Sequence, residues 1–216
     1  NALLLTCGFH DTISTYLSSF SQINANCSTY GTPDIWYKLV GNDSIYLFEI
    51  TNIFGSGAIT TYRASACNNL TCDAPQASFY QADNKYALHT MKDSTYYIRL
   101  QRTSFNEVYK FEMKLSCLPV LENDICGDAI EINVLSDTII ANVLLASGDL
   151  PLLTDCNQSP VYPISNGLWY TFDGIDGVIN IANSEQSNAF RYLIFEGDCD
   201  EWQCIENDGH RTGCPR

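Results

Sequence analysis

The sequence has few of the residues on which most catalytic and metal sites depend. It contains three histidines, His10, His89 and His210, and none stands in a ligand spacing such as HExxH. Glycine-rich phosphate loops, the dinucleotide fingerprint and the GxSxG nucleophile elbow are absent. His10 precedes Asp11 and a serine-rich stretch, and we interpret it as an exposed loop histidine rather than part of a hydrolytic triad. The sequence therefore predicts no catalytic residue, no enzyme activity and, calcium apart, no cofactor.

Long apolar runs are missing as well. The longest, such as residues 3–5 and 143–146, are far too short to cross a bilayer. No methionine opens the chain, so we interpret the sequence as a processed segment without a membrane span.

Basic residues are scarce in the second half. Residues 1–117 hold 8 basic and 9 acidic side chains, whereas residues 118–216 hold 3 and 16, with no lysine. Phosphate binding needs clustered lysine and arginine, which argues against nucleic acid as a partner. The acidic half suits basic surfaces or hard cations, or it forms a solvated face that serves solubility.

Cysteine, in contrast, is abundant. Ten cysteines in 216 residues, without CxxC pairs or histidine partners, indicate disulfides rather than zinc sites, and hence an oxidising compartment. N-glycosylation sequons agree with a secreted, extracellular or cell-surface location. They begin at Asn26, Asn42, Asn69 and Asn157.

Two halves of the chain match. The run DIWYKLVG around Trp36 recurs as GLWYTFDG around Trp169, and each run is followed by two cysteines five positions apart. The interval between the two tryptophans is almost the same as the interval between the two cysteine loops. A tandem repeat is the economical interpretation. We expect a first domain at residues 1–117, a proline-stiffened linker at 118–123 and a second domain at 124–216.

The cysteine order predicts local bridges. Along a straight strand, cysteines five apart would lie about 16 Å from each other, whereas a disulfide tolerates only about 7 Å between Cα atoms, so the chain between them must fold back. The expected pairs are Cys7 with Cys27, Cys67 with Cys72, Cys126 with Cys156 and Cys199 with Cys204, and Cys117 and Cys214 are left over.

The segments between the motifs predict β-strands. In residues 108–116, Tyr109, Phe111, Met113 and Leu115 alternate with charged side chains, as in a strand with one buried face. The same period occurs at residues 46–50 and 96–100, and no helical stripe competes with it. The fold class is therefore all-β, most simply a sandwich, and both Trp36 and Trp169 are expected in its core.

Together these motifs resemble tandem cysteine-rich repeats of secreted surface proteins, relatives of the bacterial pre-peptidase C-terminal domain. The resemblance rests on SCLPVLENDICGDAIEI, GLWYTFDG and YLIFEGDCDEWQC followed by END. It implies two disulfide-stapled, jelly-roll-like sandwiches and a non-catalytic role in adhesion, attachment or extracellular assembly. Some relatives bind calcium, but Phe190 and Arg191 stand where an aspartate is expected.

The loop between Cys199 and Cys204, with the residues that flank it, contains the only candidate metal ligands that we find in the sequence. Oxygen ligands on a pinned loop suit calcium, although the spacing matches no EF-hand, and an ordinary solvated loop is the alternative. Trp202 is either exposed, to stack on a sugar or anchor a protein contact, or packed over the disulfide. The acidic residues are Asp198, Asp200, Glu201, Glu206 and Asp208.

The second repeat is short. After Cys72 the first repeat continues for 45 residues to Cys117, whereas 12 residues follow Cys204. We expect the second sandwich to lack its closing strands and a neighbouring copy to complete it, with residues 1–6 as the donor strand and a filament or coat as the product. A fragment of a longer repeat protein and a smaller second domain are alternatives, and a carbohydrate-binding or adhesion module is the second functional hypothesis.

Overall fold

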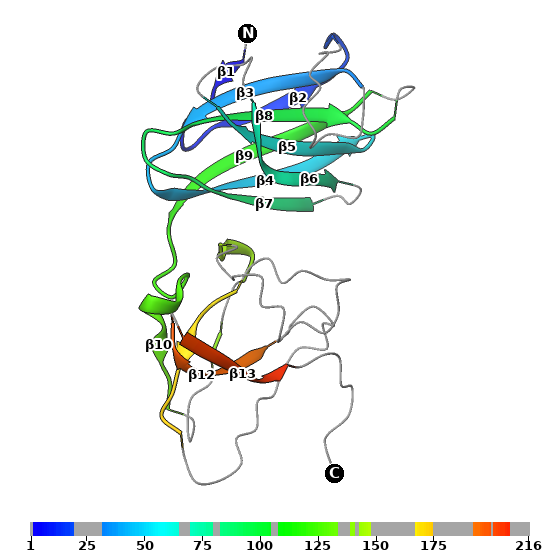
Figure 1. Ribbon diagram of the computed structural model, residues 1–216. Coiled ribbons are helices and arrows are strands. Elements are labelled where there is room, and N and C mark those ends of the chain that lie inside the picture. Colours follow the sequence, from blue (N-terminus) through cyan, green and yellow to red (C-terminus); the bar gives the residue numbers. More distant parts are fainter. Residues whose placement is uncertain are drawn as a thin grey trace, which may run out of the picture. The chain divides into compact units, whose positions relative to one another are not determined.

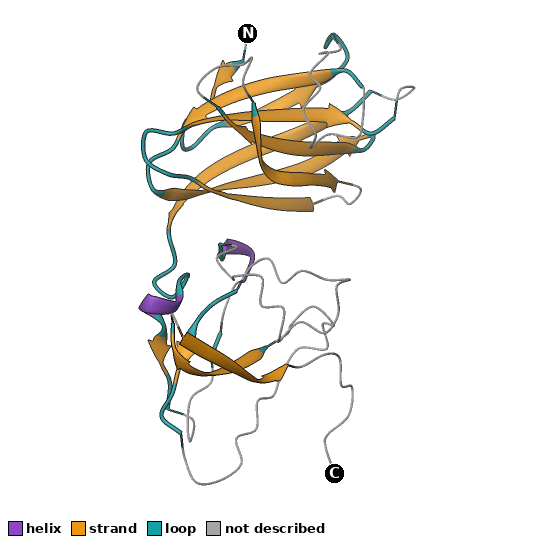
Figure 2. Cartoon of the chain, viewed as in Figure 1, coloured by secondary structure: helices purple, strands orange, loops and turns teal. Residues whose placement is uncertain are grey.

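The chain divides into two compact units, Asn1–Val120 and Leu121–Arg216. The structure is a computed structural model that describes residues 2–19, 32–64, 70–79, 83–104, 108–133, 139–140, 143–147, 167–174, 192–199 and 201–207. Strands and loops make up almost all of the described residues, and the two helical segments are single 3₁₀ turns in the second unit (Figure 2). The all-β class expected from the sequence is confirmed. No helix in the described part is long and apolar enough to cross a membrane.

The first unit is a sandwich of two sheets (Figure 1). The five-stranded sheet has the order β1-β3-β8-β5-β6 and the four-stranded sheet the order β2-β9-β4-β7. The strands are β1 (Leu3–Leu4), β2 (His10–Ser14), β3 (Asp34–Val40), β4 (Ser44–Phe54), β5 (Gly57–Arg63), β6 (Thr71–Phe79), β7 (Asp83–His89), β8 (Thr95–Arg102) and β9 (Lys110–Pro119).

The strand pairing is that of a jelly roll. The outermost strands of the β2–β9 series pair with each other, then the next ones inward: β2 with β9, β3 with β8, β4 with β7 and β5 with β6, all antiparallel. Such a nested series behaves as one long hairpin wrapped into two sheets, so alternate pairs fall in alternate sheets. The jelly-roll-like sandwich expected for the first half is what the structure has.

The core lies between the two sheets, where the alternating residues of the sequence place it. The side chains of β4, β8 and β9 that fill the core are at most 5% exposed, whereas Lys110 and Lys114 alternate with them on β9 and face solvent. The buried set expected from the period-two pattern is confirmed: Tyr46, Phe48, Ile50, Tyr96, Ile98, Leu100, Tyr109, Phe111, Met113 and Leu115.

Trp36 corrects one expectation. It lies on β3 between inward-facing Ile35 and Tyr37, so its side chain points to the outer face of the five-stranded sheet and is only half-buried. Its ring packs on Tyr62 of β5, with 5.4 Å between centroids. Trp36 therefore stabilises the outside of the sheet and does not belong to the core.

The N-terminal segment is seated in its own unit. β1 pairs in parallel with β3, and Leu5 is 3% exposed within the core. The amide of Gly8 donates to the carbonyl of Leu115 at 2.9 Å, so the chain next to Cys7 runs beside β9. Residues 1–6 are therefore not the free donor strand that the sequence predicted.

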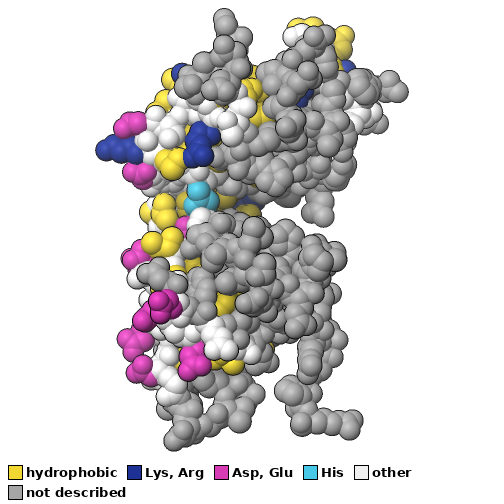
Figure 3. All heavy atoms as spheres, in the orientation of Figure 1, with side chains coloured by type: hydrophobic (Ala, Val, Ile, Leu, Met, Phe, Trp, Pro, Cys, Tyr) yellow, Lys and Arg dark blue, Asp and Glu magenta, His cyan; other side chains and the backbone are white. Residues whose placement is uncertain are grey.

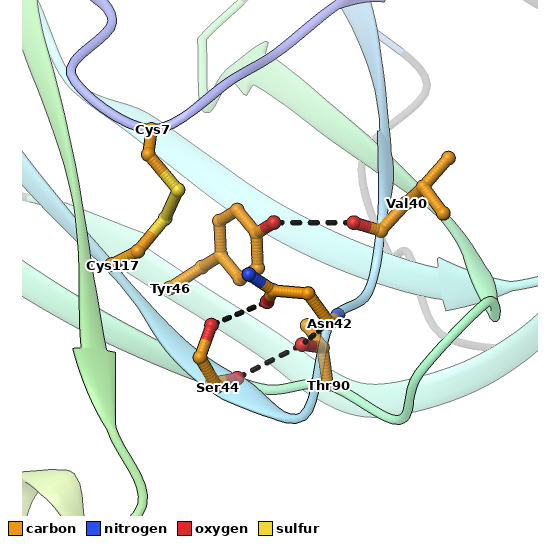
Figure 4. Close-up of a disulfide and its surroundings, with 7 residues drawn as sticks. All are labelled: Cys7, Val40, Asn42, Ser44, Tyr46, Thr90 and Cys117. Atoms are coloured by element: carbon orange, nitrogen blue, oxygen red, sulfur yellow. Dashed lines mark hydrogen bonds between the residues drawn. A yellow bond between two sulfur atoms is a disulfide. The ribbon is translucent and has the colours of Figure 1, made fainter.

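The first unit is closed by a disulfide between Cys7 and Cys117 (Figure 4), with 5.5 Å between their Cα atoms. The expected pairing of Cys7 with Cys27 is wrong, and Cys117 is not left over. The physical reason is the nested pairing of strands, because β2 lies against β9 and brings the two ends of the unit together.

The described strands of the second unit form two separate pairs. β10 (Ile130–Glu131) and β11 (Tyr170–Thr171) pair in parallel, and β12 (Leu193–Asp198) and β13 (Glu201–Asn207) form an antiparallel hairpin. Two short 3₁₀ helices, η1 (Cys126–Asp128) and η2 (Val143–Leu145), lie between β9 and β11 along the chain. A complete sandwich is not seen in the described part of this unit.

A second disulfide joins Cys126 to Cys199 with 5.7 Å between Cα atoms. The expected pairs of Cys126 with Cys156 and of Cys199 with Cys204 are therefore wrong. Cys27, Cys67, Cys156 and Cys214 lie outside the described residues, as do the side chains of Cys72 and Cys204. The expected Cys67–Cys72 pair stays a prediction.

The expected linker is partly built into the units. Leu118 and Pro119 end strand β9. Asn123 is 5% exposed, and its Nδ2 donates to the carbonyl of Trp169 at 3.0 Å, while the amide of Trp169 donates to the carbonyl of Asn123 at 2.9 Å. Trp169 itself is 9% exposed, so its expected burial is confirmed.

The Cys7–Cys117 bridge makes the first prediction. Replacing both cysteines by serine frees a loop of 110 residues, which lowers the free energy of unfolding of the first unit by about 2–5 kcal/mol. Urea unfolding followed by tryptophan fluorescence measures the loss, and the Cys126→Ser/Cys199→Ser variant is the control that leaves the first unit unchanged. A non-reduced digest that links Cys7 to Cys27 would contradict the pairing.

Candidate functional site

The outer face of the five-stranded sheet carries a buried ion pair. The Nε of Arg99 on β8 donates to Oδ2 of Asp34 on β3 at 2.7 Å, and both side chains are 2% exposed. Nε1 of Trp36 donates to the other oxygen of Asp34 at 3.1 Å. The guanidinium of Arg99 lies 5.8 Å from the centroid of the Trp36 ring, within range of a cation–π interaction. The arrangement ties β3 to β8 and leaves no reactive group accessible.

Tyr62 completes this face. Burial raises the pKa of its hydroxyl, and the nearby Arg99 opposes that rise. A phenol held neutral against a buried ion pair is a packing element, so we assign this cluster a structural role.

The outer face of the four-stranded sheet is polar and open. His10 of β2 lies beside Glu112 of β9, with 2.5 Å between Nε2 and Oε1, and Nζ of Lys114 is 3.3 Å from the same carboxylate oxygen. Glu49 of β4 and Lys85 of β7 form a second ion pair at 2.9 Å. The hydrogen bond from His10, with a smaller effect of Lys114, holds the pKa of Glu112 below its ordinary value. His10 is thus exposed, as expected, but on a strand and not in a loop.

These side chains border a shallow groove of about 250 Å³. Its carboxylates and lysines form ion pairs with each other, so the groove has no net charge. The same groups can form hydrogen bonds with the hydroxyl groups of a ligand. Its lining residues are Glu49, Ile50, Thr51, Asn84, Lys85, Glu112 and Lys114. Nothing in the sequence indicated this groove, because its members come from strands far apart in the chain.

Of the four sequons, the one at Asn42 lies in the described residues. Asn42 is exposed in the turn between β3 and β4, and Oγ of Ser44 donates to its side-chain oxygen (Figure 4). Asp43, between them, has φ of 56°, a left-handed conformation that aspartate tolerates better than most residues. Asn26, Asn69 and Asn157 lie outside the described residues, and glycosylation at all four stays a prediction.

The acidic loop of the second unit is only partly described. Asp198 and Glu201 are exposed at the tip of the β12–β13 hairpin. Asp200, Asp208 and the side chains of Glu206 and Trp202 lie outside the described part, so neither calcium nor sugar binding there is tested. Among the described residues no group of three or more His, Cys, Asp or Glu side chains could hold a metal ion.

Charge separates the two units. On the face shown in Figure 3, the first unit displays both basic and acidic side chains, whereas the coloured charged side chains of the second are acidic. In its described residues the second unit has no lysine or arginine.

The comparison with solved structures gives a match of low similarity. The chain is similar to a structure of the pre-peptidase C-terminal domain of a collagenase from Bacillus anthracis, at a TM-score of 0.36 and 10% sequence identity, over 54% of this chain and 95% of that one. No family model matches the sequence, and no curated protein does. A likeness at this level is not evidence of function.

The buried ion pair makes a prediction about stability. Asp34→Ala leaves the Arg99 guanidinium buried without its carboxylate and lowers the free energy of unfolding of the first unit by about 3–5 kcal/mol. Glu49→Ala removes an exposed partner of Lys85 and is the matched control, with a loss below about 1 kcal/mol. Urea unfolding measures both variants, and equal losses would show that the Asp34 pair is not buried.

The Asn42 turn makes a prediction about glycosylation. Expressed through the secretory pathway, the protein is expected to carry a glycan on Asn42, because this side chain is exposed in a turn. Asn42→Gln and Ser44→Ala should each remove one glycan, whereas Ser44→Thr, which preserves the sequon, should retain it. Intact mass before and after enzymatic deglycosylation reads the result, and an unmodified Asn42 in the wild-type protein would contradict it.

Proposed function

We propose that this chain is a non-catalytic structural module of a secreted protein, built from two copies of one β-sandwich, that assembles with other polypeptides by pairing β-strands at its second unit. The observation that carries the proposal is that the described strand pairs of the second unit repeat, residue by residue, pairs of the five-stranded sheet of the first.

The parallel pairs match first. Leu3 of β1 pairs with Tyr37 of β3, and Ile130 of β10 pairs with Tyr170 of β11. Tyr37 and Tyr170 directly follow the two matching tryptophans, and the chain between the paired residues is six residues longer in the second unit, 40 against 34. One hydrogen bond recurs as well, from Leu5 to the carbonyl of Lys38 at 2.8 Å and from Ile132 to that of Thr171 at 2.9 Å.

This match changes the alignment of the cysteines. Because Leu3 corresponds to Ile130, counting four residues onward from each aligns Cys7 with Val134 and not with Cys126. The two halves therefore share their strands but not the disulfides that close them.

The hairpins β5–β6 and β12–β13 also match, and they share a shift in the pairing register. In both, the register slips where the second strand of the hairpin reaches its cysteine. A bulge at the same place in both hairpins supports a common origin, since bulges are specific features of a strand pair. The pairs on either side are Thr61 with Ala74 and Tyr62 with Cys72 in β5–β6, and Ile194 with Glu206 and Phe195 with Cys204 in β12–β13.

An aromatic contact links the strand pairs in both units. Trp36 packs on Tyr62 with 5.4 Å between ring centroids, and Trp169 packs on Phe195 with 5.8 Å. Phe195 follows Tyr62 by the same interval of sequence as Trp169 follows Trp36. Three independent matches therefore support a duplicated sandwich.

The units differ in one strand. In the first unit β8 lies between β3 and β5 and pairs with both. Within the described part of the second unit, the matching strands β11 and β12 belong to separate two-stranded sheets. Strand edges can pair with strands of other chains, and this is the mode of assembly that we propose.

A carbohydrate-attachment module is the second candidate. The groove on the four-stranded sheet favours it, because its carboxylates, lysines and Asn84 are suited to hydroxyl groups. No aromatic ring lines that groove to stack on a sugar, so we rank this function second.

The association state of the oxidised, glycosylated chain tests the proposal. We expect light scattering to show concentration-dependent multimers and electron microscopy to show regular assemblies. The exposed-face variant Lys85→Ala should assemble like the wild type. A chain that stays monomeric at all concentrations and binds a glycan on an array, with binding lost in Lys85→Ala, would establish attachment instead.

A further inference from the structure

We propose that Asp11 makes β2 of the first unit a protected edge, which prevents two copies of this chain from pairing with each other through their β2 strands. The proposal goes beyond the proposed function, because it concerns the first unit and does not depend on how the second unit associates. It implies that any assembly of the chain uses surfaces other than β2.

Strand β2 lies at the edge of its sheet. Within the described residues it pairs with β9 alone, at one end of the order β2-β9-β4-β7. Its residues His10, Asp11, Thr12 and Ser14 are exposed, whereas Ile13 is buried. An exposed edge strand presents backbone N–H and C=O groups with which another strand can pair. Such an edge is a site of unwanted association unless the strand itself prevents it.

The backbone groups of β2 alternate between β9 and the edge. The carbonyl of Phe9 accepts from the amide of Leu115 at 2.9 Å. At the other end of the strand, the amide of Thr15 donates to the carbonyl of Tyr109 at 2.9 Å. Successive residues of a strand direct their N–H and C=O groups to opposite sides, so the odd-numbered residues of β2 face β9. The even-numbered residues, Thr12 among them, face the edge.

The side chain of Asp11 occupies the edge amide of Thr12. Oδ1 of Asp11 accepts from this amide at 2.7 Å. A strand that paired with β2 at this point would need the same N–H for its own hydrogen bond. An incoming strand therefore has to displace the carboxylate before it can pair with Thr12.

The carboxylate belongs to the core-facing side of β2. Ile13 is part of the core and Phe9 packs against it, and side chains two residues apart on a strand share a face. Burial raises the pKa of Tyr37 on β3 to about 12, and the negative charge of Asp11 contributes to the rise. Asp11 itself is exposed because β2 is an edge strand. A strand added beyond β2 would cover it.

Pairing of two β2 strands therefore has two costs at Asp11. The carboxylate would lose the Thr12 amide, and it would move from water to a site where an unpaired charge is strongly unfavourable. The second copy supplies no compensating cation, since residues 10–14 include no lysine or arginine. His10 cannot take that role, because its ring lies beside Glu112 on the outer face of the sheet.

Without the charge, the core-facing side of β2 would be apolar from Phe9 to Ile13. A charged residue that interrupts such a row on an edge strand is a known means of preventing edge-to-edge pairing. Asp11 has both properties of such a residue, a charge on the core-facing side and a hydrogen bond to an edge amide.

The test compares the oxidised full chain with two variants. Asp11→Val should associate at roughly tenfold lower concentration than the wild type, because its edge amide is available and no charge is buried. Glu49→Val is the matched control. It removes one carboxylate from the outer face of the same sheet and should associate like the wild type. Light scattering over a concentration series measures association.

Hydrogen exchange resolved to single amides locates the contact. In Asp11→Val the amides of Thr12 and Ser14 should gain protection as the concentration rises, whereas in the wild type their exchange should not depend on concentration. Adding Thr12→Pro to Asp11→Val should remove this association, because proline lacks the N–H that faces the edge. Proline is tolerated there, since that N–H makes no bond to β9. Circular dichroism verifies that each variant is folded.

Three outcomes would overturn the protected edge: a wild-type Thr12 amide that gains protection with concentration, an Asp11→Val chain that gains none, or equal association of Asp11→Val and Glu49→Val. The first is measured on the unchanged protein and needs no variant to fold. If the wild type assembles and Asp11→Val behaves identically, the protected edge is wrong while the proposed function stands. If only Asp11→Val associates, with protection at Thr12, the protected edge stands and the proposed function fails.

Discussion

The larger sheet of the first unit depends on its central strand. β8 pairs along its whole length with β3 on one side and β5 on the other. Its inward side chains Tyr96, Ile98 and Leu100 fill the core, and Arg99 on its other face neutralises Asp34 beneath the Trp36 ring. One strand therefore supplies backbone pairing, core volume and a buried charge at once. Its place is also the one at which the described parts of the two units differ.

The local part of this fold could be predicted from the sequence. Strict alternation, as at residues 108–116, identified strands and their buried faces, because a sheet with one solvated face imposes that period directly on the chain. The matching tryptophans identified the repeat for a related reason: each occupies a position whose neighbours, Tyr37 and Tyr170, make the same backbone pairing. The alternating pattern indicates which face of a strand is buried, but it does not indicate which other strand lies next to it in the sheet.

The non-local part could not be predicted. Cys7 meets Cys117 because the nested hairpin joins the first and last strands of the sandwich, and no spacing in the sequence encodes that closure. Trp36 was misplaced for the same reason. In DIWYKLV both faces of the strand carry apolar residues, so the sequence does not show which face is buried in the core. Trp36 can lie on the outward face because Arg99 and Tyr62, from strands distant in the chain, pack beside it. The polar groove on the four-stranded sheet likewise has members on β4, β7 and β9.

The Cys126–Cys199 bridge has a consequence for where assembly takes place. The bridge fixes the distance between the start of the second unit and the end of β12 only after it has formed, and thiols oxidise in the secretory pathway and not in the cytosol. Newly made chains in a reducing environment would present two loosely tethered strand pairs with no defined distance between them. Under the proposed function, assembly through the second unit therefore requires an oxidising compartment.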